Sequence, residues 1–128
     1  MKKIESLFTL AKQGDPEAQF KLGNEYVFGK NVPVDHAKAL KWYRNAAEQG
    51  DAKAQFNLGY MCRNGEGMPS DYVQAYKWYK LAAVHGNTNY QKLRDLVAKR
   101  LSPDQLAEAE KLANAWKPKT WQELKVQK

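Results

Sequence analysis

The sequence predicts an all-α protein, an α/α superhelical solenoid of about seven helices stacked as antiparallel pairs. A 36-residue block occurs twice without a gap, over 14–49 and 50–85, and 16 of the 36 positions are identical. Repeats of this length are typical of stacked helix pairs in which each unit contacts mainly its neighbours. Within each block, apolar residues recur at helical spacing, and glycine or aspartate stands at the expected helix boundaries.

The first helix of each block is expected to begin after an aspartate and to end near Phe28 or Asn64. Asp15 and Asp51 can accept hydrogen bonds from free backbone N–H groups of the first turn, and Pro16 stands where its missing N–H is harmless. Core-facing residues follow at spacings of four, namely Ala18, Leu22 and Tyr26 in the first block and Ala54, Leu58 and Cys62 in the second. This spacing has the period of a helix and not of a strand.

The second helix of each block is expected to begin after Asp35 or Asp71 and to end near Gln49 or His85. A stripe of small and aromatic residues repeats along it, formed by Ala39, Trp42, Tyr43, Ala46 and Ala47 and then by Ala75, Trp78, Tyr79, Ala82 and Ala83. Small residues between large ones allow helices to approach closely and interdigitate.

Gly23 and Gly59 stand inside the first helices and are predicted to be packing sites. A glycine within a helix costs about 1 kcal/mol relative to alanine. Because both blocks carry this cost, we expect a neighbouring backbone or a tryptophan ring to pass closely at this position.

The chain is expected to form one domain over 1–118, followed by a tail over 119–128. The domain would contain half a repeat, two full repeats and a terminal helix pair, over 1–13, 14–49, 50–85 and 86–117. The segment Ser102-Pro103-Asp104-Gln105 predicts the start of the last helix of this pair, because serine can cap it and glutamine can bond back to the cap. Trp121 is a candidate anchor for the tail.

Composition favours a folded cytoplasmic protein. The 128 residues are 43% hydrophobic and 12% aromatic, which is too apolar for a disordered chain. The net charge of +7 is spread along the chain and favours acidic partners mildly. Cys62 is the only cysteine, which excludes an internal disulfide and fits a reducing compartment. No adequate signal-peptide core and no run of about 20 apolar residues is present, so we expect a cytoplasmic protein without membrane contact. We also expect a monomer.

Both blocks share the pattern A-x(3)-LG-x(2)-Y-x(2)-G, then D, then A-x(2)-WY-x(2)-AA-x(2)-G. The first block carries it at Ala18, Leu22, Gly23, Tyr26, Gly29, Asp35, Ala39, Trp42, Tyr43, Ala46, Ala47 and Gly50. The second block carries it at Ala54, Leu58, Gly59, Gly65, Gly67, Asp71, Ala75, Trp78, Tyr79, Ala82, Ala83 and Gly86. With this pattern the chain resembles the Sel-one-like repeat family, a branch of the tetratricopeptide superfamily. Cys62 departs from the preferred tyrosine, and Asn31 from the second glycine of the turn.

The resemblance implies a non-enzymatic adaptor that binds a protein or peptide partner on its concave face, which first helices line in tetratricopeptide proteins. Candidate partner-binding residues on this face are Asn24, Phe28, Phe56, Tyr60, Arg63 and Asn64. Exposed rings would supply contact area, and amides would pair with a peptide backbone. For Phe20 and Phe56, packing between repeats and partner binding are equally supported. The positive charge and Arg63 favour an acidic or amphipathic peptide.

Two other function classes are alternatives to this adaptor. Some relatives are disulfide-rich secreted proteins described as penicillin-binding or β-lactamase-like, which makes a β-lactam-recognising or hydrolase-like small-molecule binder one alternative. The chain lacks their paired cysteines, and the histidines His36 and His85 have no acidic or cysteine neighbours at metal-ligand spacing, so no catalytic residue, metal or cofactor is expected. The other alternative is a basic nucleic-acid-associated protein, which the absence of a clustered basic patch disfavours.

Overall fold

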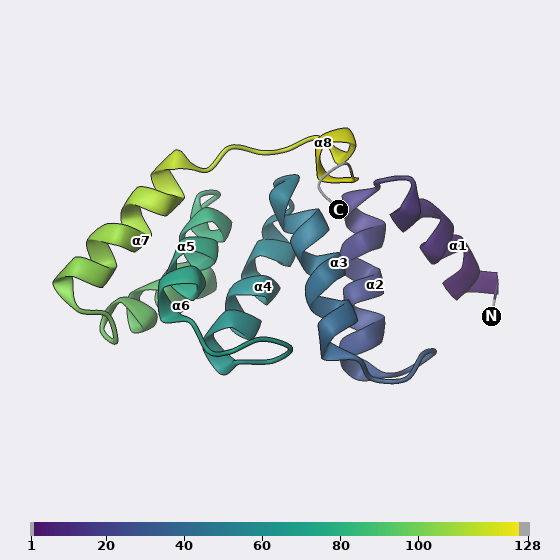
Figure 1. The fold of residues 1–128 in the computed structure, drawn as a ribbon, viewed down its shortest axis with the longest axis horizontal. Helices are drawn as coiled ribbons and strands as arrows, with labels where there is room; N and C mark the ends of the chain where they lie inside the picture. The colour runs from purple at the N-terminus through teal and green to yellow at the C-terminus, as the bar shows by residue number, and fades with distance from the viewer. Residues whose placement is uncertain (1, 126–128) are drawn as a thin grey trace.

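The computed structural model describes residues 2–125, and over this range the chain is built of α-helices joined by turns. The helices are α1 (Lys2–Lys12), α2 (Pro16–Phe28), α3 (His36–Glu48), α4 (Ala52–Asn64), α5 (Tyr72–Ala83), α6 (Thr88–Ala98), α7 (Pro103–Ala115) and α8 (Trp121–Lys125). In Figure 1 the helices from α1 to α7 follow one another along the long axis of the molecule. The predicted all-helical solenoid is confirmed, with seven stacked helices and the short helix α8 in the tail of the described chain.

Local capping rules account for most helix boundaries. Asp15 and Asp51 accept hydrogen bonds from the third residue of α2 and α4, at 3.0 and 2.9 Å. The capping box of α7 is also present, because Ser102 and Gln105 bond reciprocally at 2.9 and 3.1 Å. At the other end of α2, Gly29 adopts a left-handed conformation with φ of 67°, which ends the helix without steric cost. These caps agree with the sequence prediction.

Within each repeat, the two helices approach where a glycine faces a tyrosine ring. A Cβ atom at Gly23 would lie 2.5 Å from two ring carbons of Tyr43, and one at Gly59 would lie 2.8 Å from the Tyr79 ring. The expected packing role of these glycines is confirmed. The ring at both positions is that of a tyrosine and not of a tryptophan. At Gly59 a neighbouring backbone also comes close, because the carbonyl oxygen of Ala75 would lie 3.3 Å from the added Cβ atom. Tyrosine reaches this position because it lies on the side of the second helix that faces the first.

Between repeats, a buried glutamine joins each unit to the preceding one. Gln19 donates from Nε2 to the carbonyl of Ala11 at 3.0 Å, and Gln55 donates to the carbonyl of Ala47 at 3.1 Å. Both glutamine side chains are buried. These carbonyl groups lie at the C-terminal ends of α1 and α3, where each also accepts a backbone hydrogen bond, from Gly14 or Gly50, at 3.0 Å. The glutamine therefore fixes the position of one repeat relative to the next.

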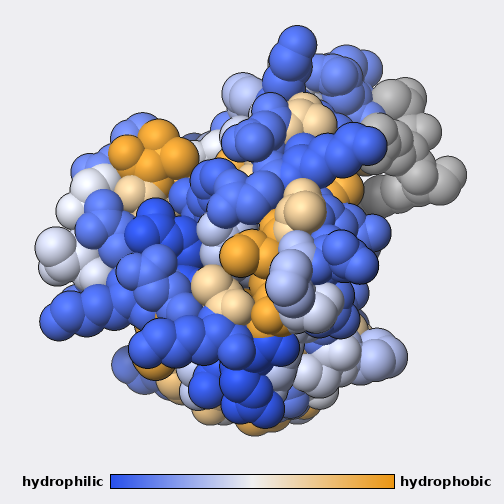
Figure 2. All heavy atoms as spheres, turned by 90° about the vertical axis from the view of Figure 1, so that its left-hand side faces the viewer, coloured by the Kyte–Doolittle hydropathy of each residue, from blue (hydrophilic) through white to orange (hydrophobic). Residues whose placement is uncertain are grey.

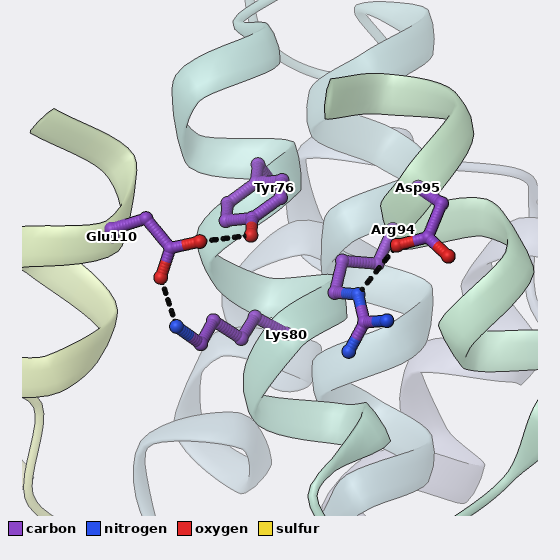
Figure 3. Close-up of polar contacts among 5 residues, drawn as sticks. All are labelled: Tyr76, Lys80, Arg94, Asp95 and Glu110. Carbon is purple, nitrogen blue, oxygen red and sulfur yellow. Dashed lines mark hydrogen bonds and ion pairs between the residues drawn. The ribbon is translucent and has the colours of Figure 1, made fainter. Parts of the chain in front are cut away.

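A carboxylate bridge holds α7 against α5. Figure 3 shows Glu110 of α7 accepting hydrogen bonds from Tyr76 and Lys80 of α5. Beside it, the Trp78 ring packs edge-on against Trp116, with 6.3 Å between ring centroids. These contacts place the terminal helix on the second helix of the preceding repeat.

After α7 the chain forms a C-terminal strap, residues 116–125, which runs back along the solenoid. Trp116 donates from Nε1 to Glu48 Oε1 at 2.8 Å, and the backbone N–H of Lys119 donates to the Glu48 carbonyl at 2.7 Å. Trp121 then lies against Gly14, where a Cβ atom would come within 2.4 Å of its ring. Figure 1 shows the strap crossing the upper ends of the helices and α8 lying near the turn between α1 and α2.

The end of the solenoid formed by α6 and α7 is largely polar. Figure 2 faces this end and shows a predominantly hydrophilic surface with small apolar areas. In solenoid proteins in general, terminal units with a polar outer face are required for solubility. None of the helices between residues 2 and 125 has the length and hydrophobicity of a membrane span.

Gly59→Leu is expected to lower the free energy of unfolding by about 1–3 kcal/mol, because the new side chain must displace the Tyr79 ring. Chemical denaturation measures the change. The matched control is Lys53→Leu, at an exposed position of the same helix, which should shift stability by less than about 0.5 kcal/mol. Equal effects of the two substitutions would show that the close contact at Gly59 is not important for stability.

The Glu110 bridge predicts a pH-dependent contribution to stability. Hydrogen bonds from Lys80 and Tyr76 hold the pKa of Glu110 below its ordinary value. A lowered pKa in the folded state stabilises the protein above the unfolded pKa of about 4.3, and this contribution is lost as the pH falls further. Solvent screens the pair, so Glu110→Gln should cost at most about 1 kcal/mol at pH 7. Urea titrations at pH 7 and pH 3 should show this difference shrinking, and a constant difference would contradict the assignment.

Candidate partner-binding groove

The described residues form a groove of about 400 Å³ between α2 and α4, the first helices of the two repeats. Its lining combines aromatic rings, amides and one carboxylate, contributed by Asn24, Val27, Phe28, His36, Tyr43, Phe56, Asn57, Tyr60, Met61 and Glu66. We call this the α2–α4 groove.

Helical spacing places the amides and rings of α2 and α4 along the same groove. On α2, Asn24 and Phe28 are four residues apart and lie one above the other, and on α4 Asn57 and Tyr60 are three apart. The second helix of the first repeat contributes Tyr43, which the glycine contact allows to pass close to α2. The floor of the groove is therefore made by the same packing that joins the helices of a repeat.

A small polar network crosses the groove. Tyr43 donates from its hydroxyl to Asn24 Oδ1 at 2.5 Å, and Asn57 Nδ2 donates to the same oxygen at 3.4 Å. Burial raises the pKa of Tyr43 to about 12, so its hydroxyl stays protonated and acts as a donor at neutral pH. The network links both repeats through one amide and fixes Asn24 in the groove.

Two aromatic side chains of the groove are open to solvent. The Phe28 side chain is 76% exposed and Tyr60 is 46% exposed, although both are large and apolar enough to gain from burial. Neither ring belongs to the core, to which α2 and α4 contribute fully buried side chains such as Leu22 and Leu58. Exposed rings beside a groove are a feature of binding surfaces.

The structure brings together four of the six residues predicted from sequence. Asn24, Phe28, Phe56 and Tyr60 all line the α2–α4 groove. Arg63 and Asn64 lie beyond it at the C-terminal end of α4, where both are exposed and Arg63 Nη1 donates to Asn64 Oδ1 at 3.1 Å. They form an exposed polar edge next to the groove, not part of its lining.

Phe20 and Phe56 are both half-buried and pack against tyrosines. Phe20 lies 6.0 Å from the Tyr43 ring, and Phe56 stacks on Tyr90 at 4.4 Å between centroids. Phe56 also forms part of the groove wall, whereas Phe20 does not. Phe56 thus contacts the next helix with one part of its surface and the groove with another.

Four polar groove residues were not among those predicted, namely His36, Tyr43, Asn57 and Glu66. His36 is the first residue of α3 and its Nδ1 is buried, with no hydrogen-bond partner among the described residues. Glu66 belongs to the turn after α4, between Gly65 and Gly67. A comparison of the two repeats could have indicated Glu66, because Lys30 stands in the first block where Glu66 stands in the second.

The second repeat lacks the polar network of the first. Tyr60 occupies the position that corresponds to Asn24, so the equivalent tyrosine, Tyr79, has no amide to bond. The Tyr79 hydroxyl is buried without a hydrogen-bond partner in residues 2–125, and burial raises its pKa to about 12. An unpaired buried hydroxyl costs stability, because its hydration is lost and not replaced.

Cys62 is packed in the core and not presented to the groove. Its side chain is fully buried, and burial raises the pKa of its thiol to about 11. A protonated, enclosed thiol is a poor nucleophile.

The family model for the Sel1 repeat matches residues 16–51 and 52–87, which together make up more than half of the chain. The chain belongs to the Sel1 repeat family. Proteins with Sel1 repeats generally act as scaffolds for protein interactions, and the predicted family and fold are both confirmed.

Two solved structures resemble this Sel1 repeat chain. One is c5321, a protective antigen of uropathogenic Escherichia coli strains with an SLR fold; it is 35% identical, with a TM-score of 0.85 over 98% of this chain and 28% of that one. The chain thus spans little more than a quarter of that protein. The other is a Sel1 repeat protein from Oxalobacter formigenes, 37% identical, with a TM-score of 0.70 over 72% of this chain and 69% of that one. A search of curated proteins gives no match.

Removal of the equivalent tyrosine hydroxyl is expected to change the free energy of unfolding differently in the two repeats. Tyr43→Phe should lower the free energy of unfolding by about 0.5–1.5 kcal/mol, because the bond to Asn24 is lost. Tyr79→Phe, its matched control, should leave stability unchanged or raise it, because that hydroxyl is buried and unpaired. Both can be measured by urea denaturation, and a larger loss for Tyr79→Phe would mean that its hydroxyl is satisfied in solution.

Proposed function

We propose that this Sel1 repeat chain is a non-enzymatic interaction module that binds a peptide segment of a partner protein along α2 and α4. The observation that carries the proposal is the α2–α4 groove, in which the exposed rings of Phe28 and Tyr60 flank two amides. Rings supply apolar contact area at low cost in conformational entropy, and amides can pair with an extended backbone. Membership of a family of interaction scaffolds supports the same function.

The exposed polar edge beyond the groove, formed by Arg63 and Asn64, favours a negatively charged partner segment. Arg63 is exposed at the end of α4, and the chain as a whole carries a net charge of +7. Both favour a partner segment that carries a carboxylate near this edge. An exposed ion pair adds at most about 1 kcal/mol, so the rings contribute more to affinity than Arg63 does. We also propose that the module acts as a monomer in a reducing compartment. The single buried thiol of Cys62 supports the reducing compartment.

A peptide selection tests this function. A phage-displayed peptide library is panned on the immobilised protein, and the enriched peptides are synthesised and titrated by fluorescence anisotropy. Tyr60→Ala should weaken binding by more than about fivefold, since central aromatic anchors contribute more than 1 kcal/mol. Leu96→Ala is the control, because Leu96 is also exposed but belongs to α6, outside the groove. Failure to enrich any peptide, or equal affinity for Tyr60→Ala and the wild type, would contradict the proposal.

A further inference from the structure

The charge of the α2–α4 groove differs from the charge of the whole protein. Among its lining residues, Glu66 is the only carboxylate, and no lysine or arginine is present. In the described residues, the Glu66 side chain has neither a hydrogen bond nor an ion pair. A protein with a net charge of +7 thus presents a free negative charge at this groove.

We propose that the α2–α4 groove receives a basic side chain, arginine or lysine, of the partner segment, with Glu66 as its counter-ion and Phe28 and Tyr60 as its aromatic walls. The inference rests on the proposed function, because it names the chemistry of the residue that enters the same groove.

The turn after α4 fixes Glu66 at the groove. Gly65 ends α4 in a left-handed conformation with φ of 73°, and the N–H of Glu66 donates to the Met61 carbonyl at 3.1 Å. Gly67 packs directly on the start of α3, where a Cβ atom would lie 2.8 Å from the carbonyl oxygen of His36. The turn is therefore held from both sides, and the carboxylate between the two glycines stays beside α3 and the groove.

The aromatic lining complements a cation as well as its aliphatic stem. The faces of Phe and Tyr rings attract a guanidinium or ammonium group within about 6 Å. The exposed surfaces of Phe28 and Tyr60 can also cover the methylene stem, which long basic side chains bury while their charge stays hydrated. A groove of about 400 Å³ has room for such a side chain. An acidic or purely apolar side chain would leave the Glu66 charge unpaired.

The hollow between α1 and α2 provides a contrast. It is larger, at about 610 Å³, but its charges are mixed, because Lys21 and Lys30 accompany Glu25. Glu25 also accepts a hydrogen bond from Asn31 at 2.8 Å. This carboxylate is already engaged, whereas the α2–α4 groove combines an unpaired carboxylate with exposed aromatic rings. The proposed partner segment would therefore carry two charged residues, a basic one in the groove beside Glu66 and an acidic one outside the groove near Arg63.

The test uses N-acetyl-arginine methylamide as the probe and its uncharged analogue, N-acetyl-citrulline methylamide, as the comparison. Each is titrated into the full ¹⁵N-labelled chain at low salt, and binding is followed by the NMR signals of the Asn24 and Asn57 side-chain amides and the Glu66 backbone. The arginine probe should shift these signals and bind about twofold to fivefold more tightly than the citrulline probe.

The Glu66→Gln variant should abolish the preference for arginine over citrulline. Glu25→Gln is the matched control, because it removes the same charge from a carboxylate outside the groove, and it should retain the preference. Equal binding of both probes to the wild type, no saturable shift, shifts centred elsewhere, or an unchanged preference in Glu66→Gln would each overturn the inference.

The selected peptides separate this inference from the proposed function. Peptides that need Tyr60 but contain no essential arginine or lysine would uphold the function and overturn the inference. A specific arginine-probe response at Glu66 without any enriched peptide would uphold the inference about the groove and overturn the function.

Discussion

The close contact between a glycine of the first helix and a tyrosine ring of the second is the constraint on which each repeat depends. Because Gly23 has no side chain, the Tyr43 ring can lie against α2, and its hydroxyl then reaches Asn24 in the groove. A larger residue in place of the glycine would separate the helices and move the hydroxyl away from its acceptor. The missing side chain of Gly23 thus sets both the separation of the two helices and the contact that holds Asn24 in the groove.

The shared positions of the two repeats build the solenoid, and the positions that differ give the groove its chemistry. Gln19 and Gln55 occupy equivalent places and make equivalent bonds between units. In contrast, Asn24 corresponds to Tyr60, and Lys30 corresponds to Glu66. These exchanges put an amide on one wall of the groove, an exposed ring on the other, and a carboxylate at its end. A symmetrical pair of repeats would have no such directional surface.

Helix boundaries could be predicted because they follow local rules, whereas the groove depends on tertiary contacts. Asp15 caps a helix that begins next to it in sequence, so its role is visible without the fold. Helical spacing places Tyr60 on the side of α4 that faces the groove. It does not show how far the groove extends along the helix axis, and Arg63 lies beyond the end of the groove. The position of Glu66 depends on Gly67 meeting α3, a contact between different repeats that no local pattern encodes.

The C-terminal strap changes how the solenoid loses its structure. In an array with contacts only between neighbouring units, the terminal helices fray first and unfolding spreads inward one unit at a time. Trp121 joins the last helix to Gly14 at the start of the first full repeat, which is a contact of very long sequence separation. Neither end can then open alone without losing this contact. The strap makes unfolding more cooperative and raises the contact order, so the short array should melt as one unit and fold more slowly than an open one.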